Sequence, residues 1–177
     1  MAVLAEAISV VVRVDAIHRS YKGGWKTFEA KAPNKTLCSD NEITRVGFMA
    51  PGDVRRFTDA LEQNGLTYLD AAKARDMVVV DQQRGPCVDC DWIEFGRIPL
   101  GAGETQLVAA CRLKGSQSTT LMMPDEWTYE GSLSEQLVFV PTSELSKHLE
   151  YIETDEVGDV YLDKRTGKRV YAGRTYG

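Results

Sequence analysis

The clearest structural unit of the chain is predicted by three stretches, which read ITRVGFM at 43–49, PGDVRRFTDALEQN at 51–64 and MVVV at 77–80. Pro51 suits the first turn of a helix, because its φ is already helical and its missing N–H would have no partner there. Asp53 favours the positive end of the helix dipole, and Gly65 can end the helix in a left-handed conformation. Residues 43–80 therefore predict a strand, a helix and a short buried strand, which can form a right-handed crossover unit.

Before this unit, hydrophobic periodicity predicts one strand and two helices. The strand is expected at 8–14, where β-branched residues dominate. Asp15 is expected to cap a first helix at 16–21, and a second helix is expected at 25–32.

After this unit, the pattern turns mostly to strands separated by turn residues. The expected strands lie at 92–98, 106–114, 119–123 and 137–140. A helix capped by Thr142 or Ser143 is expected to reach about Tyr151. A terminal hairpin is expected to join 160–163 to 168–172 through Gly167, which can adopt positive φ.

Helices early and strands late predict an α+β protein that forms a single globular domain over residues 1–177. We expect a mixed or mostly antiparallel sheet, three to four helices, a strand-rich second half and a C-terminal β-hairpin. With 177 residues, 43% of them hydrophobic and 27% charged, the chain has an ordinary globular composition. A chain of this length buries about 70% of its unfolded surface, so the core needs no metal or disulfide.

Charge and hydropathy limit the partners and the location. The formal net charge is −5, and an acidic surface repels phosphate backbones, so no nucleic-acid partner is predicted. The apolar run within residues 1–14 contains Glu6 and has no basic leader, so no secretory signal is expected. No run approaches the ~18 uncharged apolar residues that span a bilayer, so no membrane association is predicted. We expect a cytoplasmic protein whose four cysteines are free thiols.

The segment DQQRGPCVDCDW, residues 81–92, concentrates the reactive side chains. Cys87 and Cys90 have the spacing of a metal chelate or a redox dithiol, but a structural zinc site needs four ligands. The other thiols and imidazoles, which are not spaced as a second ligand pair, are Cys38, Cys111, His18 and His148. Cys38 is expected in a polar loop that leaves it free to approach, whereas Cys111 is expected to be buried in a strand.

A redox role for the two thiols would be favoured by a helix N-terminus, which lowers a thiol pKa. The residues after Cys90 instead alternate as in a strand. Asp89 and Asp91 should also raise the thiol pKa by like-charge repulsion. We therefore interpret the segment as a surface loop between two strands, with Gly85-Pro86 forming its turn.

Two loops combine aromatic and acidic side chains, one from Arg84 to Trp92 and the other from Asp125 to Glu130. Aromatic side chains in loops can anchor a partner at low entropic cost, and an acidic face suits a basic partner. We expect the two loops to form one recognition face. The predicted binding residues are Arg84, Asp89, Asp91, Trp92, Trp127 and Tyr129.

The predicted function is that of a small cytosolic, non-enzymatic binding protein whose partner is a protein or a small ligand. No catalytic residue, resident metal or cofactor is predicted. The alternative is a metal-binding or thiol-dependent enzyme centred on Cys87 and Cys90, with help from Cys38, Asp89 and Asp91. Enzymatic activity therefore stays open, and no oligomeric state is predicted.

Overall fold

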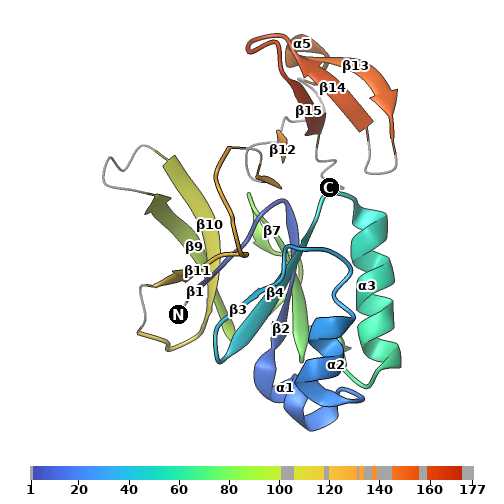
Figure 1. Ribbon diagram of the computed structural model, residues 1–177, viewed down its shortest axis with the longest axis vertical. Coiled ribbons are helices and arrows are strands. Elements are labelled where there is room, and N and C mark those ends of the chain that lie inside the picture. Colours follow the sequence, from blue (N-terminus) through green and yellow to red (C-terminus); the bar gives the residue numbers. More distant parts are fainter. Residues whose placement is uncertain are drawn as a thin grey trace. The chain divides into compact units, whose positions relative to one another are not determined.

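The computed structural model describes residues 2–100, 106–117, 120–130, 132–133, 137–138, 145–155 and 159–172. The chain divides into two compact units, Met1–Trp127 and Thr128–Gly177. Four helices and both antiparallel and parallel strand pairs occur in the described residues, which confirms the α+β class (Figure 1). The expectation of one domain over residues 1–177 stays a prediction. No helix within the described ranges is long and apolar enough to cross a membrane.

The first unit is organised around a five-stranded sheet with the order β3-β4-β2-β7-β8. Its strands are β2 (Ile8–Arg13), β3 (Cys38–Ser39), β4 (Ile43–Phe48), β7 (Met77–Asp81) and β8 (Gly85–Pro86). The predicted unit at 43–80 is present, because α3 (Pro51–Gln63) connects β4 to β7. Both strands pair antiparallel with β2, so they run parallel to each other with β2 between them. The handedness of this crossover stays a prediction.

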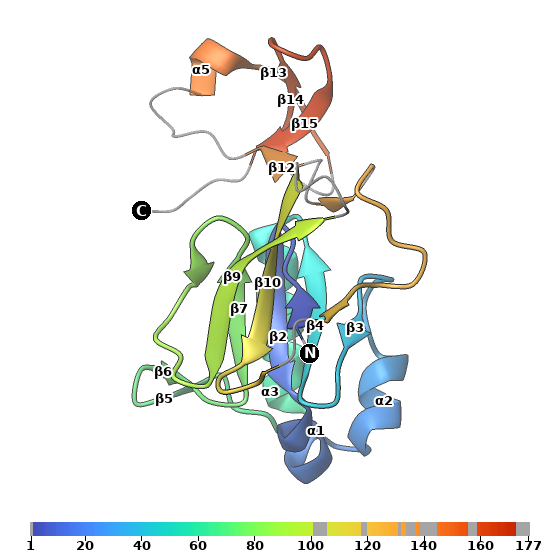
Figure 2. The same ribbon diagram turned by 90° about the vertical axis from the view of Figure 1, so that its left-hand side faces the viewer.

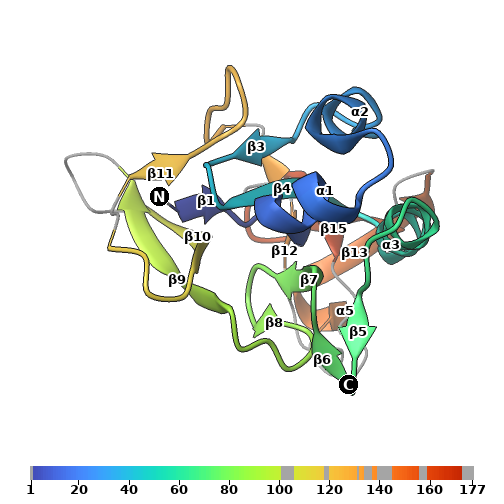
Figure 3. The ribbon, with the colours of Figure 1, turned by 90° about the horizontal axis from the view of Figure 1, so that it is seen from below.

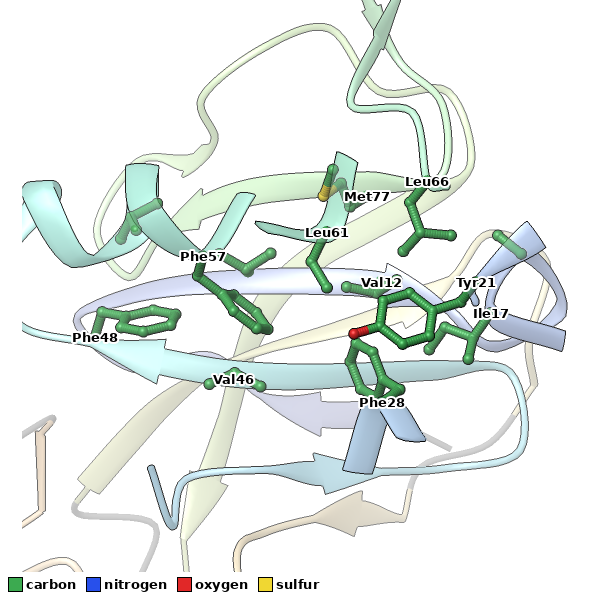
Figure 4. Close-up of a cluster of buried hydrophobic side chains, with 13 residues drawn as sticks. Val12, Ile17, Tyr21, Phe28, Val46, Phe48, Phe57, Leu61, Leu66 and Met77 are labelled. Carbon is green, nitrogen blue, oxygen red and sulfur yellow. The ribbon is translucent and has the colours of Figure 1, made fainter. Parts of the chain in front are cut away.

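Three helices cover one face of this sheet, and a second sheet lies on its other side (Figures 1 and 3). The other two helices are α1 (Val14–Ser20) and α2 (Gly24–Ala30). Aromatic rings fill the layer between helices and sheet, with ring centroids 5.3 Å apart for Phe48 and Phe57 and 5.5 Å apart for Tyr21 and Phe28 (Figure 4). The buried members of this cluster are Val10, Val12, Ala16, Ile17, Tyr21, Phe28, Val46, Phe48, Val54, Phe57, Leu61, Leu66 and Met77.

The helix ends correct one sequence expectation. Asp15 was expected to cap the first helix, but α1 begins at Val14 and has no side-chain cap. The cause is that β2 runs directly into α1 with the buried Val14 at the junction, which leaves Asp15 in the first turn. Asp15 there forms ion pairs with Arg13 (2.9 Å) and Arg19 (3.5 Å). Gly65, after α3, has φ +109°, as its position after the helix predicted.

The second sheet of this unit has the order β11-β1-β10-β9. It contains β1 (Ala2–Leu4), β9 (Ile93–Leu100), β10 (Gln106–Leu113) and β11 (Leu121–Met122), so β1 lies between two strands from the far end of the unit (Figure 2). The chain passes from this sheet to the five-stranded sheet between β1 and β2, where Ala7 has φ +47°. Gln82 holds this bend, because its Oε1 accepts from the Ala7 N–H (2.6 Å) and its N–H donates to the Ala7 carbonyl (2.9 Å).

An ion pair is buried between the two sheets. Arg45 lies opposite Val11 in the β2–β4 register, so its side chain leaves the sheet on the face away from the Val10 and Val12 cluster. Its Nη2 lies 3.5 Å from Glu6 Oε2, and the two side chains are 0% and 2% exposed. Arg45 Nε also donates to Ser9 Oγ (3.0 Å), and its Nη1 donates to the Thr36 carbonyl (3.1 Å). The pair therefore lies in a hydrogen-bonded environment, which a buried charge requires.

The second unit contains a four-stranded sheet with the order β12-β15-β14-β13. Its elements are α5 (Leu145–His148), β12 (Leu137–Val138), β13 (Leu149–Thr154), β14 (Asp159–Asp163) and β15 (Arg169–Ala172). The predicted terminal hairpin is confirmed by the antiparallel pairing of β14 with β15, and Gly167 in its turn has φ +70°.

The expected helix up to Tyr151 is wrong in its last turn. The helix ends at His148, and Leu149 to Tyr151 belong to β13. This stretch pairs with β14, where the rings of Tyr151 and Tyr161 lie 5.8 Å apart on opposite strands. Cross-strand aromatic contacts of this kind stabilise a sheet and override the local helical pattern. The two predicted capping residues, Thr142 and Ser143, lie outside the described residues.

Candidate binding site around Trp92

The thiol segment begins with a tight turn that the Asp81 side chain stabilises. Asp81 Oδ1 accepts hydrogen bonds from the N–H groups of Gln83 (2.8 Å) and Arg84 (3.0 Å). The turn therefore lies at 81–84, and the expectation that Gly85-Pro86 forms it is wrong. Those two residues form β8 and pair with the end of β7. The aspartate provides the turn because its carboxylate bonds the backbone two and three residues ahead.

The segment after β8 is hydrogen-bonded to a small hairpin, which is formed by β5 (Leu69–Asp70) and β6 (Lys73–Ala74). The Ala74 N–H donates to the Asp89 carbonyl (2.8 Å), and Lys73 Nζ lies 3.6 Å from Asp89 Oδ2. Trp92 Nε1 donates to the Ala74 carbonyl (3.1 Å). These bonds fix the half-buried indole of Trp92 against the hairpin, so the predicted surface loop has a defined conformation.

The turn of this hairpin is strained. Ala71 and Ala72 form the two-residue loop between β5 and β6, and their φ values are +49° and +66°. Two-residue hairpin loops with positive φ at both positions favour Asn-Gly, because a Cβ in this conformation is unfavourable. Backbone strain of this kind is often retained where it shapes a binding site.

Replacing Ala71-Ala72 with Asn-Gly is expected to raise the free energy of unfolding by about 1 kcal/mol, because it relieves this strain. Urea denaturation followed by circular dichroism measures the change. Ala60→Gly, at an exposed site within α3, is the control and should lower stability by about 1 kcal/mol. A loss of stability in the Asn-Gly variant would contradict the strain argument.

Trp92 and the hairpin form the wall of a cavity with a volume of about 330 Å³, which we call the Trp92 pocket. Its lining residues are Arg13, Asp70, Ala71, Lys73, Ala74, Arg75, Asp91 and Trp92. The Arg13 guanidinium carbon lies 5.8 Å from the centroid of the Trp92 ring. Predicted residues Asp91 and Trp92 therefore line one pocket, and Asp89 pairs with a third lining residue, Lys73.

The charges of the Trp92 pocket are almost all paired. Each cation has a carboxylate partner, the pairs being Arg13–Asp15 (2.9 Å), Lys73–Asp89 (3.6 Å) and Arg75–Asp70 (3.5 Å). Within the described part of the chain, the exposed carboxylate of Asp91 makes no hydrogen bond or ion pair. It is therefore the charged group of the pocket that is open to an incoming cation.

The two thiols next to the pocket are free, with Cys87 exposed and Cys90 half-buried. Although Cys87 is exposed as a whole residue, desolvation of its thiol raises its pKa, and the Asp81 charge raises it further. Burial also raises the pKa of Cys90, and Asp91 and Asp89 contribute in the same direction. The predicted effect of the two aspartates is thus confirmed for Cys90, although burial is the larger cause. A raised pKa reduces the thiolate fraction, which is the nucleophilic and metal-binding form.

The other two cysteines lie inside the first unit. Cys38 was expected in an open polar loop, but it is buried in β3, so that expectation is wrong. It pairs with Arg45 in the strand register, and β4 holds it in the sheet. Cys111 is buried in β10 as predicted, and burial raises its pKa to about 12. Within the described ranges, no group of three or more His, Cys, Asp or Glu side chains is placed to hold a metal ion. The alternative of a metal-binding or thiol-dependent enzyme stays a prediction.

Of the remaining predicted binding residues, Arg84 and Trp127 do not line the Trp92 pocket. Arg84 is exposed in the turn between β7 and β8. Trp127 is half-buried, and its Nε1 donates to Glu6 Oε1 (3.0 Å), so it supports the buried ion pair. Tyr129 belongs to the second unit. The structure thus brings together Asp89, Asp91 and Trp92 from the six predicted residues.

Sequence reasoning missed four charged residues at the Trp92 pocket, namely Arg13, Asp70, Lys73 and Arg75. Arg13 lies at the end of β2, far from the others in sequence, and carries no motif. The hairpin was missed because Ala-Ala is not a turn signal, unlike Asn-Gly or Asp-Gly. The alternation of charged and small residues in DAAKAR, residues 70–75, was the available indication.

The interpretation of the Trp92 pocket depends on its own contacts, charges and burial. No protein-family model matches the chain, and neither a curated protein nor a solved structure matches it.

Proposed function

We propose that this is a small cytosolic, non-enzymatic binding protein that recognises a basic side chain of a partner protein at the Trp92 pocket. The observation that carries the proposal is the carboxylate of Asp91, which has no partner among the described residues and lies beside a fixed indole. Four free cysteines agree with a reducing compartment such as the cytosol. The acidic loop predicted to suit a basic partner supplies Asp89, Asp91 and Trp92 to this region.

The pairing of the charges in the pocket favours a cationic ligand. Its lining contains three cations and two carboxylates, and each cation already has a carboxylate partner. Asp91 is thus the lining charge without a partner among the described residues. A lysine or arginine of a partner can form a charge-assisted hydrogen bond with Asp91 while its methylene groups contact the indole of Trp92. Tryptophan is also enriched among the residues that contribute most to protein–protein binding.

The pocket supplies selectivity for charge more than high affinity. A hydrogen bond to a charged group contributes about 1.5–3 kcal/mol. A single basic side chain is therefore expected to bind weakly by itself. The rest of a partner surface would add the contacts needed for a stable complex.

Binding is tested by titrating Nα-acetyl-lysine-methylamide, a short lysine derivative whose side-chain ammonium is free and charged. The Trp92 indole N–H signal is followed by NMR. A saturable shift is expected for the charged probe, whereas the same probe with an acetylated Nζ should produce none. Asp91→Asn should weaken binding at least about tenfold, because it removes the charge-assisted bond. The signal is assigned by its loss in Trp92→Phe.

Asp59→Asn is the matched control, since Asp59 is exposed on α3 and distant in sequence from the pocket. It should bind the probe as the wild type does. If Asp91→Asn and Asp59→Asn have equal affinities, the charge of Asp91 does not select the ligand and the proposed function is wrong.

A further inference from the structure

The four-stranded sheet of the first unit carries a larger cavity, with a volume of about 670 Å³, which we call the β9–β10 groove. Residues of β1, β9 and β10 line it, and it shares no lining residue with the Trp92 pocket. Small-molecule sites in proteins usually have volumes of about 300–1,000 Å³. The groove is therefore large enough for a ligand of two fused rings.

Three small residues form the floor of the groove. Ala110 lies opposite Gly96 in the β9–β10 register, and Ala2 lies opposite Arg112 in the β1–β10 register. Opposed residues of neighbouring strands share a sheet face, so Ala2, Gly96 and Ala110 present their small side chains on one face. A Cβ added at Gly96 would meet no atom within 4 Å. The groove is hollow here because these positions carry almost no side chain.

One end of this face carries an ion pair whose arginine can still donate hydrogen bonds to a ligand. Glu94 lies opposite Arg112, and its Oε2 accepts from Arg112 Nε at 2.6 Å. Both side chains are 40% exposed. The two terminal nitrogens of Arg112 have no partner within the described residues. Arg112 can therefore bind Glu94 along one edge of its guanidinium group and a second anion at the other.

A second guanidinium leaves β9 on the other face. Arg97 lies opposite Ala109 in the β9–β10 register, so its side chain points away from the face of Gly96, Ala110 and Arg112. Its Nη2 donates only to the uncharged oxygens of Gln82 and Gln83, at 3.3–3.5 Å. Within the described part of the chain, Arg97 has no carboxylate partner. On the face of Gly96 and Ala110, the positive charge therefore comes from Arg112. Its two terminal nitrogens, which have no partner among the described residues, favour an anionic ligand.

We propose that the β9–β10 groove binds a small organic acid with a flat apolar body. The ring system would lie on Ala2, Gly96 and Ala110, with Ile98 as an apolar neighbour on the same face. The carboxylate would accept two hydrogen bonds from the terminal nitrogens of Arg112, which is the preferred geometry for arginine and a carboxylate. This binding site is independent of the function proposed for the Trp92 pocket.

The proposal is tested with 2-naphthoate and its uncharged counterpart 2-naphthylmethanol, by isothermal titration calorimetry on the full chain. The acid is expected to bind at least about tenfold more tightly than the alcohol, because only the acid forms charge-assisted bonds. Arg112→Gln should remove this difference while retaining weak binding of both. Gly96→Val should weaken both ligands at least about tenfold, because its methyl groups fill the floor.

Both variants are expected to fold. Valine favours a strand and its Cβ would meet no atom within 4 Å at position 96, and the Glu94–Arg112 pair is exposed enough to contribute little stability. Thermal unfolding of each variant verifies this. Equal affinity for acid and alcohol in the wild type, no binding of either, or unchanged binding in Gly96→Val would each overturn the proposal. A change in sedimentation on Gly96→Val would also overturn it, by showing that the groove is an interface between copies of the chain.

Discussion

Arg45→Met is expected to lower the free energy of unfolding by about 3–5 kcal/mol, because it leaves the Glu6 carboxylate buried without its cation. Both side chains are almost completely inaccessible to solvent. The variant also removes the donors to Ser9 Oγ and to the Thr36 carbonyl. Urea denaturation followed by far-UV circular dichroism, in parallel with the wild type, measures the loss.

The exposed pair on the second sheet provides a matched control. Arg112→Met removes one partner of the Glu94–Arg112 pair, whose side chains are 40% exposed. It should cost less than about 1 kcal/mol, since water solvates the remaining charge. The double variant Glu6→Gln/Arg45→Met should recover part of the stability lost in Arg45→Met, because no charge stays buried. Equal losses for Arg45→Met and Arg112→Met would show that burial does not decide the effect.

Gly65→Ala is expected to lower the free energy of unfolding by at least about 2 kcal/mol. Gly65 follows α3 with φ +109°, and a Cβ there would lie 2.3 Å from the Ser20 carbonyl oxygen. That oxygen belongs to the backbone of α1 and cannot move aside as a flexible side chain can. The substitution therefore adds a steric clash to the strain of a left-handed alanine. Urea denaturation measures the effect.

Gly115→Ala separates the clash from the strain. Gly115 has φ +87°, and a Cβ there would meet no atom within 4 Å. Its replacement should cost only the strain of a positive φ, about 1 kcal/mol. If the two alanine variants are equally stable, the approach to Ser20 has no energetic importance.

Regular elements were predictable from the sequence wherever the local pattern agreed with the tertiary contacts. The strand at 8–14 is rich in β-branched residues, and the helix at 51–64 has clear start and end signals at Pro51 and Gly65. The structure contains β2 and α3 within one residue of these bounds. The stretch at 149–151 was predicted to be helical from its local sequence, without the strand that pairs with it. Pairing with β14 decides its conformation, and that information is not local.

The site was less predictable, because its residues come from separate segments. The aromatic and acidic character of the loop at 89–92 was visible, whereas the hairpin that holds Trp92 was not. The buried ion pair could not be predicted either, since Arg45 and Glu6 are separated by 39 residues and each has an ordinary sequence context. Polar partners inside a fold are decided by sheet register, which the hydrophobic pattern of a single strand does not specify.

The position of β1 has a consequence for synthesis on the ribosome. Ala2–Leu4 pairs with residues 110–112 on one side and with 121–122 on the other, so its partners are among the last of the first unit to be translated. During translation, this apolar segment therefore stays without its strand partners while more than a hundred further residues are added to the chain. At about 5–20 residues per second this interval lasts several seconds, during which a nascent-chain chaperone has time to bind it.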